Sequence, residues 1–262
     1  MNALPRLRPL ELLQIPNEGM LLRDPEGFSE EELVLSEPAV FIAAHFDGEH
    51  TLEDAQKAFG ERYGRMPTES EVRALWDQLS EAFFLENDAF VARKQSRIES
   101  FLGTAERAPA HEGVAYPKDP EEAKKTVTRF FEEANSLEQS GEIPSGSLAG
   151  LVAPHIDLRH GGPCTALAYR YLAEATHINT VVVLGTSHAC PEPAWIVSDK
   201  PFQTPLGTVP IDEEAVNYLR SSAPSTKEQL YLHRHEHSIE FQAVFLAALR
   251  SLGRSISMVP VL

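Results

Sequence analysis

LAGLVAPH, residues 148–155, is an apolar run that ends in a histidine, and TVVVLGTSH, residues 180–188, has the same design. Between these runs, Cys164 to Ala175 has the apolar period of a helix. We therefore predict a strand at Leu148 to Ala153, a crossover helix, and a neighbouring parallel strand at Thr180 to Leu184. His155 and His188 then both leave the carboxyl edge of an open α/β sheet, where such sheets bind ligands.

This spacing makes His155 and His188 candidate metal ligands. Adjacent strands lie about 4.8 Å apart, so imidazoles at their ends can reach one ion at about 2.0–2.1 Å each. Two histidines with one further soft or carboxylate ligand would suit iron(II), copper or zinc, and a thiolate would favour copper or zinc. The alternative for the first loop is an ordinary strand-to-helix turn, in which Asp157 or His160 caps the helix.

A third histidine cluster, HRHEHSIE at residues 233–240, leads into a helical pattern from Ile239 to Leu252. Exposed histidines among charged residues usually have no special function, so the tract as a whole is a weak signal. His237 differs because it opens an otherwise apolar helix and can serve as an acid or base near neutral pH. We take His237 as the candidate catalytic residue, which Glu240, one turn later, could orient.

Composition excludes several classes of function. The chain has 262 residues, 42% of them hydrophobic, and a formal charge of −16, which disfavours nucleic acid and anionic membranes as partners. It has no apolar stretch near the roughly 20 residues of a spanning helix and no signal-like N-terminus, so we expect a cytoplasmic protein. Cys164 and Cys190 are expected to be small, unpaired, at least partly buried thiols. Neither a phosphate loop nor a nucleophile elbow is present.

Three segments are expected along the chain. Residues 10–92 form a helical module with N-cap signals at Ser36, Thr51 and Thr68 and extended pieces at Gly19 to Leu22 and Phe84 to Ala92, which gives a winged-helix-like unit. Residues 93–147 are expected to be a linker followed by a helix from Pro120 to Leu137. Residues 148–262 form the α/β domain, whose last apolar run, Ile256 to Leu262, is predicted to be a core strand. With no covering element after that strand, we expect a substantial C-terminal portion of the domain to be missing and the sheet to be incomplete.

The N-terminal segment resembles the small PqqD-like modules through four short motifs and a final segment. The motifs are Ser36-Glu37-Pro38, Asp47-Gly48, Thr51-Leu52-Glu53-Asp54 and Tyr63-Gly64, and the final segment is Leu79 to Leu85. The resemblance implies that residues 10–92 bind a peptide or protein partner. The rival interpretation is a purely structural cap.

The C-terminal segment resembles the Memo family, also called protein B of the AmmeMemoRadiSam system, in five blocks that occur in the same order. The blocks are Ala153-Pro154-His155 with Gly162, Leu184 to His188, Thr204 to Gly207 with Ile211-Asp212, Glu236 to Glu240, and Val259 to Leu262. The resemblance covers only the N-terminal half of that family's domain. It implies a sheet with flanking helices similar to that of the class III extradiol dioxygenases, which use non-haem iron(II).

The resemblance also implies roles for particular residues. His155 and His188 match two metal ligands, and His237 matches the pocket histidine near the metal. The third ligand, a cysteine in Memo proteins and a glutamate in the dioxygenases, is expected beyond Leu262. Asp157, Arg159 and His160 depart from the family pattern, so the substrate side of the pocket is expected to differ.

Two functions stay open at this point. The first is a metal-dependent redox enzyme, an iron or copper oxidoreductase of the dioxygenase type, with dioxygen or a small aromatic molecule at the open metal position. The second is a non-catalytic metal-binding or peptide-binding adaptor that works with a radical enzyme. The sequence carries no signature of the substrate.

Overall fold

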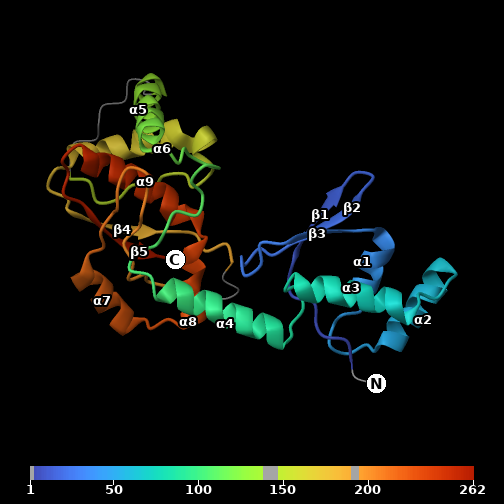
Figure 1. The fold of residues 1–262 in the computed structure, drawn as a ribbon. Coiled ribbons are helices and arrows are strands. Elements are labelled where there is room, and N and C mark those ends of the chain that lie inside the picture. The colour runs from blue at the N-terminus through green and yellow to red at the C-terminus, as the bar shows by residue number, and fades with distance from the viewer. Residues whose placement is uncertain (1–2, 138–146, 190–194) are drawn as a thin grey trace. The chain divides into compact units, whose positions relative to one another are not determined.

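The computed structural model describes residues 3–137, 147–189 and 195–262. It is a mixed α/β structure with two compact units, Met1–Ser100 and Phe101–Leu262 (Figure 1). Among the described residues, no helix is both long enough and apolar enough to span a membrane.

The first unit combines a small antiparallel sheet with helices. The sheet has the order β1-β2-β3, and Gly19 to Leu22, predicted to be extended, lies in β2. The elements are β1 (Glu11–Ile15), β2 (Gly19–Arg23), β3 (Glu32–Leu35), α1 (Glu37–Ala43), α2 (Leu52–Tyr63), α3 (Glu69–Glu81) and α4 (Asp88–Leu102).

Local sequence signals explain where these helices begin. Thr51 and Thr68 each form a complete capping box at the start of α2 and α3, as predicted, whereas Ser36 precedes α1 without a side-chain cap. The expectation of an extended piece from Phe84 to Ala92 is wrong over most of its length. Asn87 accepts a hydrogen bond from Phe90 N at 2.9 Å and α4 begins at Asp88, so the chain turns into a helix that continues into the stretch predicted to be a linker.

The second unit contains a two-stranded parallel sheet and most of the long helices. Its helix α5 has the predicted bounds, and its strands β4 and β5 pair with Val182 opposite Val259. The elements are α5 (Pro120–Leu137), α6 (Leu158–Glu174), β4 (Thr180–Leu184), α7 (Glu213–Ser222), α8 (Lys227–Tyr231), the 3-10 turn η1 (Leu232–Arg234), α9 (His237–Ser251) and β5 (Ser257–Val261).

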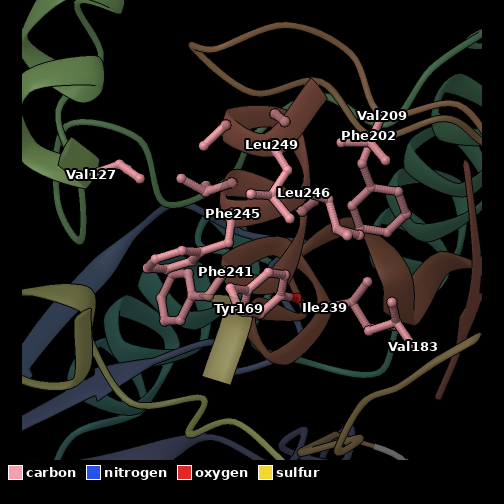
Figure 2. Packing of buried hydrophobic residues seen from close by; sticks show 14 of the residues in the cluster. Val127, Tyr169, Val183, Phe202, Val209, Ile239, Phe241, Phe245, Leu246 and Leu249 are labelled. Atoms are coloured by element: carbon pink, nitrogen blue, oxygen red, sulfur yellow. The ribbon is translucent and has the colours of Figure 1, made fainter. Parts of the chain in front are cut away.

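Helix α9 is the centre of this unit's core. Every residue from Ser238 to Leu249 is buried, as expected for a helix that is apolar on all sides. Figure 2 shows the packing around it, in which the rings of Tyr169 and Phe245 lie 5.2 Å apart between centroids. The core therefore fixes the N-terminus of α9, where His237 lies.

The predicted strand at Leu148 to Ala153 is wrong. These residues belong to no strand, and Val152 is 95% exposed. Among the described residues β4 pairs with β5 alone, and a groove of about 720 Å³ is lined both by residues 148–153 and by β4. A strand forms backbone hydrogen bonds to a neighbouring strand about 4.8 Å away. Residues 148–153 face a groove instead of such a neighbour, so they form no strand. The predicted strand at Thr180 to Leu184 is confirmed as β4, and the predicted final strand corresponds to β5.

Candidate metal centre

His155, His188 and His237 come together in the second unit. Each offers one ring nitrogen, and these three atoms all lie within 4.8 Å of one another. The ring centroids are 5.3 Å apart for His155 and His188, 5.6 Å for His155 and His237, and 4.6 Å for His188 and His237. The three imidazoles singled out from the sequence therefore form one group that could hold a metal ion, although the strand expected to carry His155 is absent.

A close approach between the end of β4 and the start of α9 brings two of these histidines together. Ser238 Oγ accepts a hydrogen bond from Thr186 N at 3.0 Å and donates one to Thr186 O at 3.1 Å. A Cβ atom on Gly185 would lie 2.6 Å from Ile239 Cγ1 and 2.7 Å from Ser238 Oγ. Only glycine allows this contact, which places His188 beside His237.

Glu236 holds the His188 ring. Its carboxylate accepts hydrogen bonds from His188 Nδ1 at 3.0 Å and from His188 N at 3.0 Å, and it caps α9 by accepting from Ser238 N at 2.9 Å. A carboxylate only accepts, so Nδ1 carries a hydrogen, and in the neutral ring Nε2 keeps its lone pair. Burial alone would raise the pKa of the Glu236 carboxyl, but the hydrogen bonds from Ser238 and His188 hold it below its ordinary value.

The environment of His237 favours the neutral imidazole. Burial lowers the pKa of His237, Glu236 opposes this effect, and the neighbouring imidazoles of His188, His111 and His155 add to it. A neutral imidazole can bind a metal or accept a proton.

Glu240 does not orient His237 as expected, since no hydrogen bond joins the two in the described part of the chain. Its fully buried carboxylate instead pairs with the fully buried guanidinium of Arg107 and accepts hydrogen bonds from Tyr116 Oη and from His111 N, the last at 2.9 Å. Burial would raise the pKa of Glu240, but its hydrogen bonds and Arg107 hold it well below its ordinary value.

The Glu240 network adds residues that sequence reasoning missed. His111 Nδ1 lies 3.2 Å from Glu240 Oε2, and its ring centroid is 5.7 Å from that of His237. Arg107, His111 and Tyr116 all lie in the stretch predicted to be a linker. The available signal was Glu240 itself, because a carboxylate in an apolar helix requires a cation and hydrogen-bond donors from elsewhere in the chain.

Other sequence candidates lie apart from the cluster. Asp157 caps α6 through Arg159 N at 2.8 Å, so the predicted cap is confirmed, although no strand precedes the loop. His233 is buried and donates from Nε2 to Ile196 O at 2.9 Å, and His160 and His235 are exposed. Cys164, expected to be at least partly buried, is a free, exposed thiol on α6, whereas Cys190 lies outside the described residues.

Comparison with known proteins assigns most of the second unit to one protein family. The model of the Memo-like protein family matches residues 107–262. The chain therefore belongs to the Memo-like family, which confirms the resemblance drawn from the five blocks. The matched range begins at Arg107, the residue that pairs with Glu240.

Individual relatives carry the same family name. A MEMO1 family protein of Aquifex aeolicus is 30% identical over 243 residues, which cover 92% of this chain and 62% of that protein. One from Methanopyrus kandleri is 37% identical over 160 residues, covering 60% of this chain and 56% of that protein. One from Ignicoccus hospitalis is 34% identical over 162 residues, covering 59% and 55%. The chain thus spans little more than half the length of these relatives.

Proposed function

We propose that the three-histidine cluster is a transition-metal site, with His155 and His188 as ligands and His237 as an acid or base beside the ion. The observation that carries this proposal is the convergence of one ring nitrogen from each histidine within 4.8 Å. The ion would be iron(II) or copper, with zinc as the alternative, because imidazole suits all three.

The residues present fit such an ion. Metal-binding histidines generally donate their second ring N–H to a carboxylate or carbonyl, and His188 does so to Glu236. Burial lowers the pKa of His237, which favours the neutral ring with a free lone pair. Ligand nitrogens at about 2.0–2.1 Å from one ion are about 3.4 Å apart in tetrahedral geometry, so small side-chain movements would close the cluster around the ion.

The proposed reaction class is a dioxygenase-like oxidation. When bound, the metal would supply a Lewis acid with an open position for dioxygen or for a hydroxylated aromatic substrate. His237 would accept the proton of the substrate hydroxyl and return it later in the cycle. His155 and His188 would hold the ion in place. A class III dioxygenase-like fold and a cytoplasmic location belong to the same proposal.

The second candidate is an adaptor that works with a radical enzyme, as the AmmeMemoRadiSam resemblance implies. It is supported by the Aquifex aeolicus relative, whose similarity covers 92% of this chain and so extends through most of the first unit. Under this proposal the first unit is a winged-helix-like, PqqD-like module, and its function is to bind a peptide or protein partner.

Metal content tests the site. The protein is purified anaerobically and analysed by mass spectrometry beside the double variant His155→Ala, His188→Ala. A matched control replaces two exposed histidines outside the cluster, His160→Ala with His235→Ala. We expect near-stoichiometric iron or copper in the natural chain and in the control, and trace metal in the cluster variant with an unchanged circular dichroism spectrum.

Equal, trace metal in all three proteins would contradict the metal site. Where the site is present, turnover of an aromatic diol that depends on His237 would favour the enzyme. Peptide affinity that survives the loss of both ligands would favour the adaptor.

A further inference from the structure

Glu236 is an unusual residue at a helix start. The side-chain N-caps of the other described helices are all short residues, namely Thr51, Thr68, Asn87, Asp119, Asp157, Asp212 and Thr226. Short side chains are the preferred caps because their oxygen reaches the first free N–H groups directly. A glutamate is not needed to begin α9, so its extra length calls for a second explanation.

The extra length reaches His188. The Glu236 side chain is 6% exposed, and both of its oxygens lie near His188 Nδ1, at 3.0 and 3.1 Å. One of these oxygens also caps the helix and the other accepts from the His188 backbone. One carboxylate therefore ties the loop after β4 to the start of α9.

The backbone of Glu236 is fixed as well. Arg107 donates from Nη2 to Glu236 O at 3.0 Å, while the same guanidinium pairs with Glu240. Since both members of that pair are fully buried, the carboxylate of Glu236 starts from a rigid backbone position.

We propose that Glu236 is a positioning residue that sets the tautomer and the ring orientation of His188 for metal binding. By accepting the Nδ1 hydrogen, it leaves the Nε2 lone pair available to a metal and raises the basicity of that nitrogen. This inference rests on the proposed metal site. Removal of such outer partners typically weakens metal binding about 10-fold to 100-fold.

Two substitutions separate positioning from capping. Glu236→Ser keeps a good helix cap but is too short to reach His188. Glu236→Gln keeps the length of the side chain, but its amide group can no longer accept hydrogen bonds at both ends from His188 and Ser238. The matched control is Asp212→Ser, which makes a similar change at the N-cap of α7, away from the histidines. Affinity for zinc alone is measured by competition with a chromophoric chelator, together with the melting temperature of the metal-free proteins.

We expect zinc binding about 10-fold to 100-fold weaker in Glu236→Ser, a smaller loss in Glu236→Gln, and no change in Asp212→Ser. Melting temperatures of Glu236→Ser and the control should fall by similar small amounts. Equal zinc affinity in all four proteins would overturn the role of Glu236 while leaving the metal site intact.

Nitrogen NMR of the metal-free protein gives a readout that does not depend on the ion. His188 should be the Nδ1–H tautomer in the natural chain and should shift toward Nε2–H in Glu236→Ser. If the natural chain binds no zinc but the tautomer shifts as expected, the proposed function fails and the positioning of His188 stands. An unchanged tautomer would overturn the positioning role itself.

Discussion

The two sides of the histidine cluster are built in different ways. His188 and His237 lie where the end of β4 meets α9. Hydrogen bonds through Ser238 and Glu236 hold that contact, and the buried ion pair of Glu240 with Arg107 anchors α9. His155 follows an extended segment that belongs to no strand, and the described residues give its ring no hydrogen bond. The segment is tied to α9 by a bond from Gln242 Nε2 to Pro154 O at 3.2 Å.

This difference shows that similar sequence motifs can be supported to very different degrees. His155 and His188 each follow an apolar run, but only the run before His188 gains a strand partner and a helix to pack against. We infer that two imidazoles are positioned by the core before any ion binds, whereas binding itself must help to position His155. Substitutions should then change the free energy of unfolding strongly on the α9 side of the cluster and weakly on the His155 side.

The largest effect is expected from Glu240→Ala. Removing one partner of a buried ion pair leaves the other charge uncompensated, so the free energy of unfolding should fall by about 3–5 kcal/mol. The matched change on the other side is Arg159→Ala, which removes the exposed partner of Asp157 and should leave the free energy of unfolding almost unchanged, because exposed ion pairs are screened by solvent. Urea denaturation followed by circular dichroism measures both. Similar losses in the two variants would contradict the difference between the sides.

A pH dependence should come from His233, just before α9. Burial lowers its pKa from 6.5 to about 4, and among the described residues its Nδ1 has no hydrogen-bond partner. The folded state therefore disfavours protonation. The stability associated with the neutral ring is complete above pH 6.5 and is lost as the pH falls toward 4, where the loss reaches about 3 kcal/mol.

The matched variant for this prediction is His233→Gln, whose amide can still donate to Ile196 O but does not titrate in this range. Other carboxyl groups also protonate in acid, so the informative quantity is the difference in unfolding free energy between the two proteins. That difference should shift by about 3 kcal/mol between pH 7 and pH 4. A difference that stays constant with pH would show that His233 is protonated equally well in the folded state.

The sequence predicted the three histidines of the cluster better than it predicted the structure around them. Histidines after apolar runs, and the apolar helix that His237 opens, are visible as patterns. Capping boxes at Thr51 and Thr68 are equally local, so they too could be predicted. Whether an apolar run becomes a strand depends on a partner far away in the sequence, which is why β4 was correct and residues 148–153 were not.

The Glu240 network could not be predicted for a related reason. Its members Arg107, His111 and Tyr116 occur in a stretch without periodicity, and their role depends on a carboxylate more than 120 residues later. Such long-range polar contacts leave no periodic signal. The same holds for Glu236, whose function as a cap is local but whose contact with His188 spans 48 residues.

The smallest predicted effect compares two glycines that line the same groove. An added Cβ at Gly185 would lie 2.6 Å from Ile239 Cγ1, whereas at Gly150 it would meet no atom within 4 Å. Gly185→Ala must push α9 away from β4 and should cost about 1–3 kcal/mol in unfolding free energy. Gly150→Ala should stay within about 0.5 kcal/mol of the natural chain. Zinc affinity should follow the same order, because the displaced contact is the one that places His188 beside His237. If both alanines proved neutral, the contact between β4 and α9 would be adaptable, and the two sides of the cluster would be equally dependent on the ion.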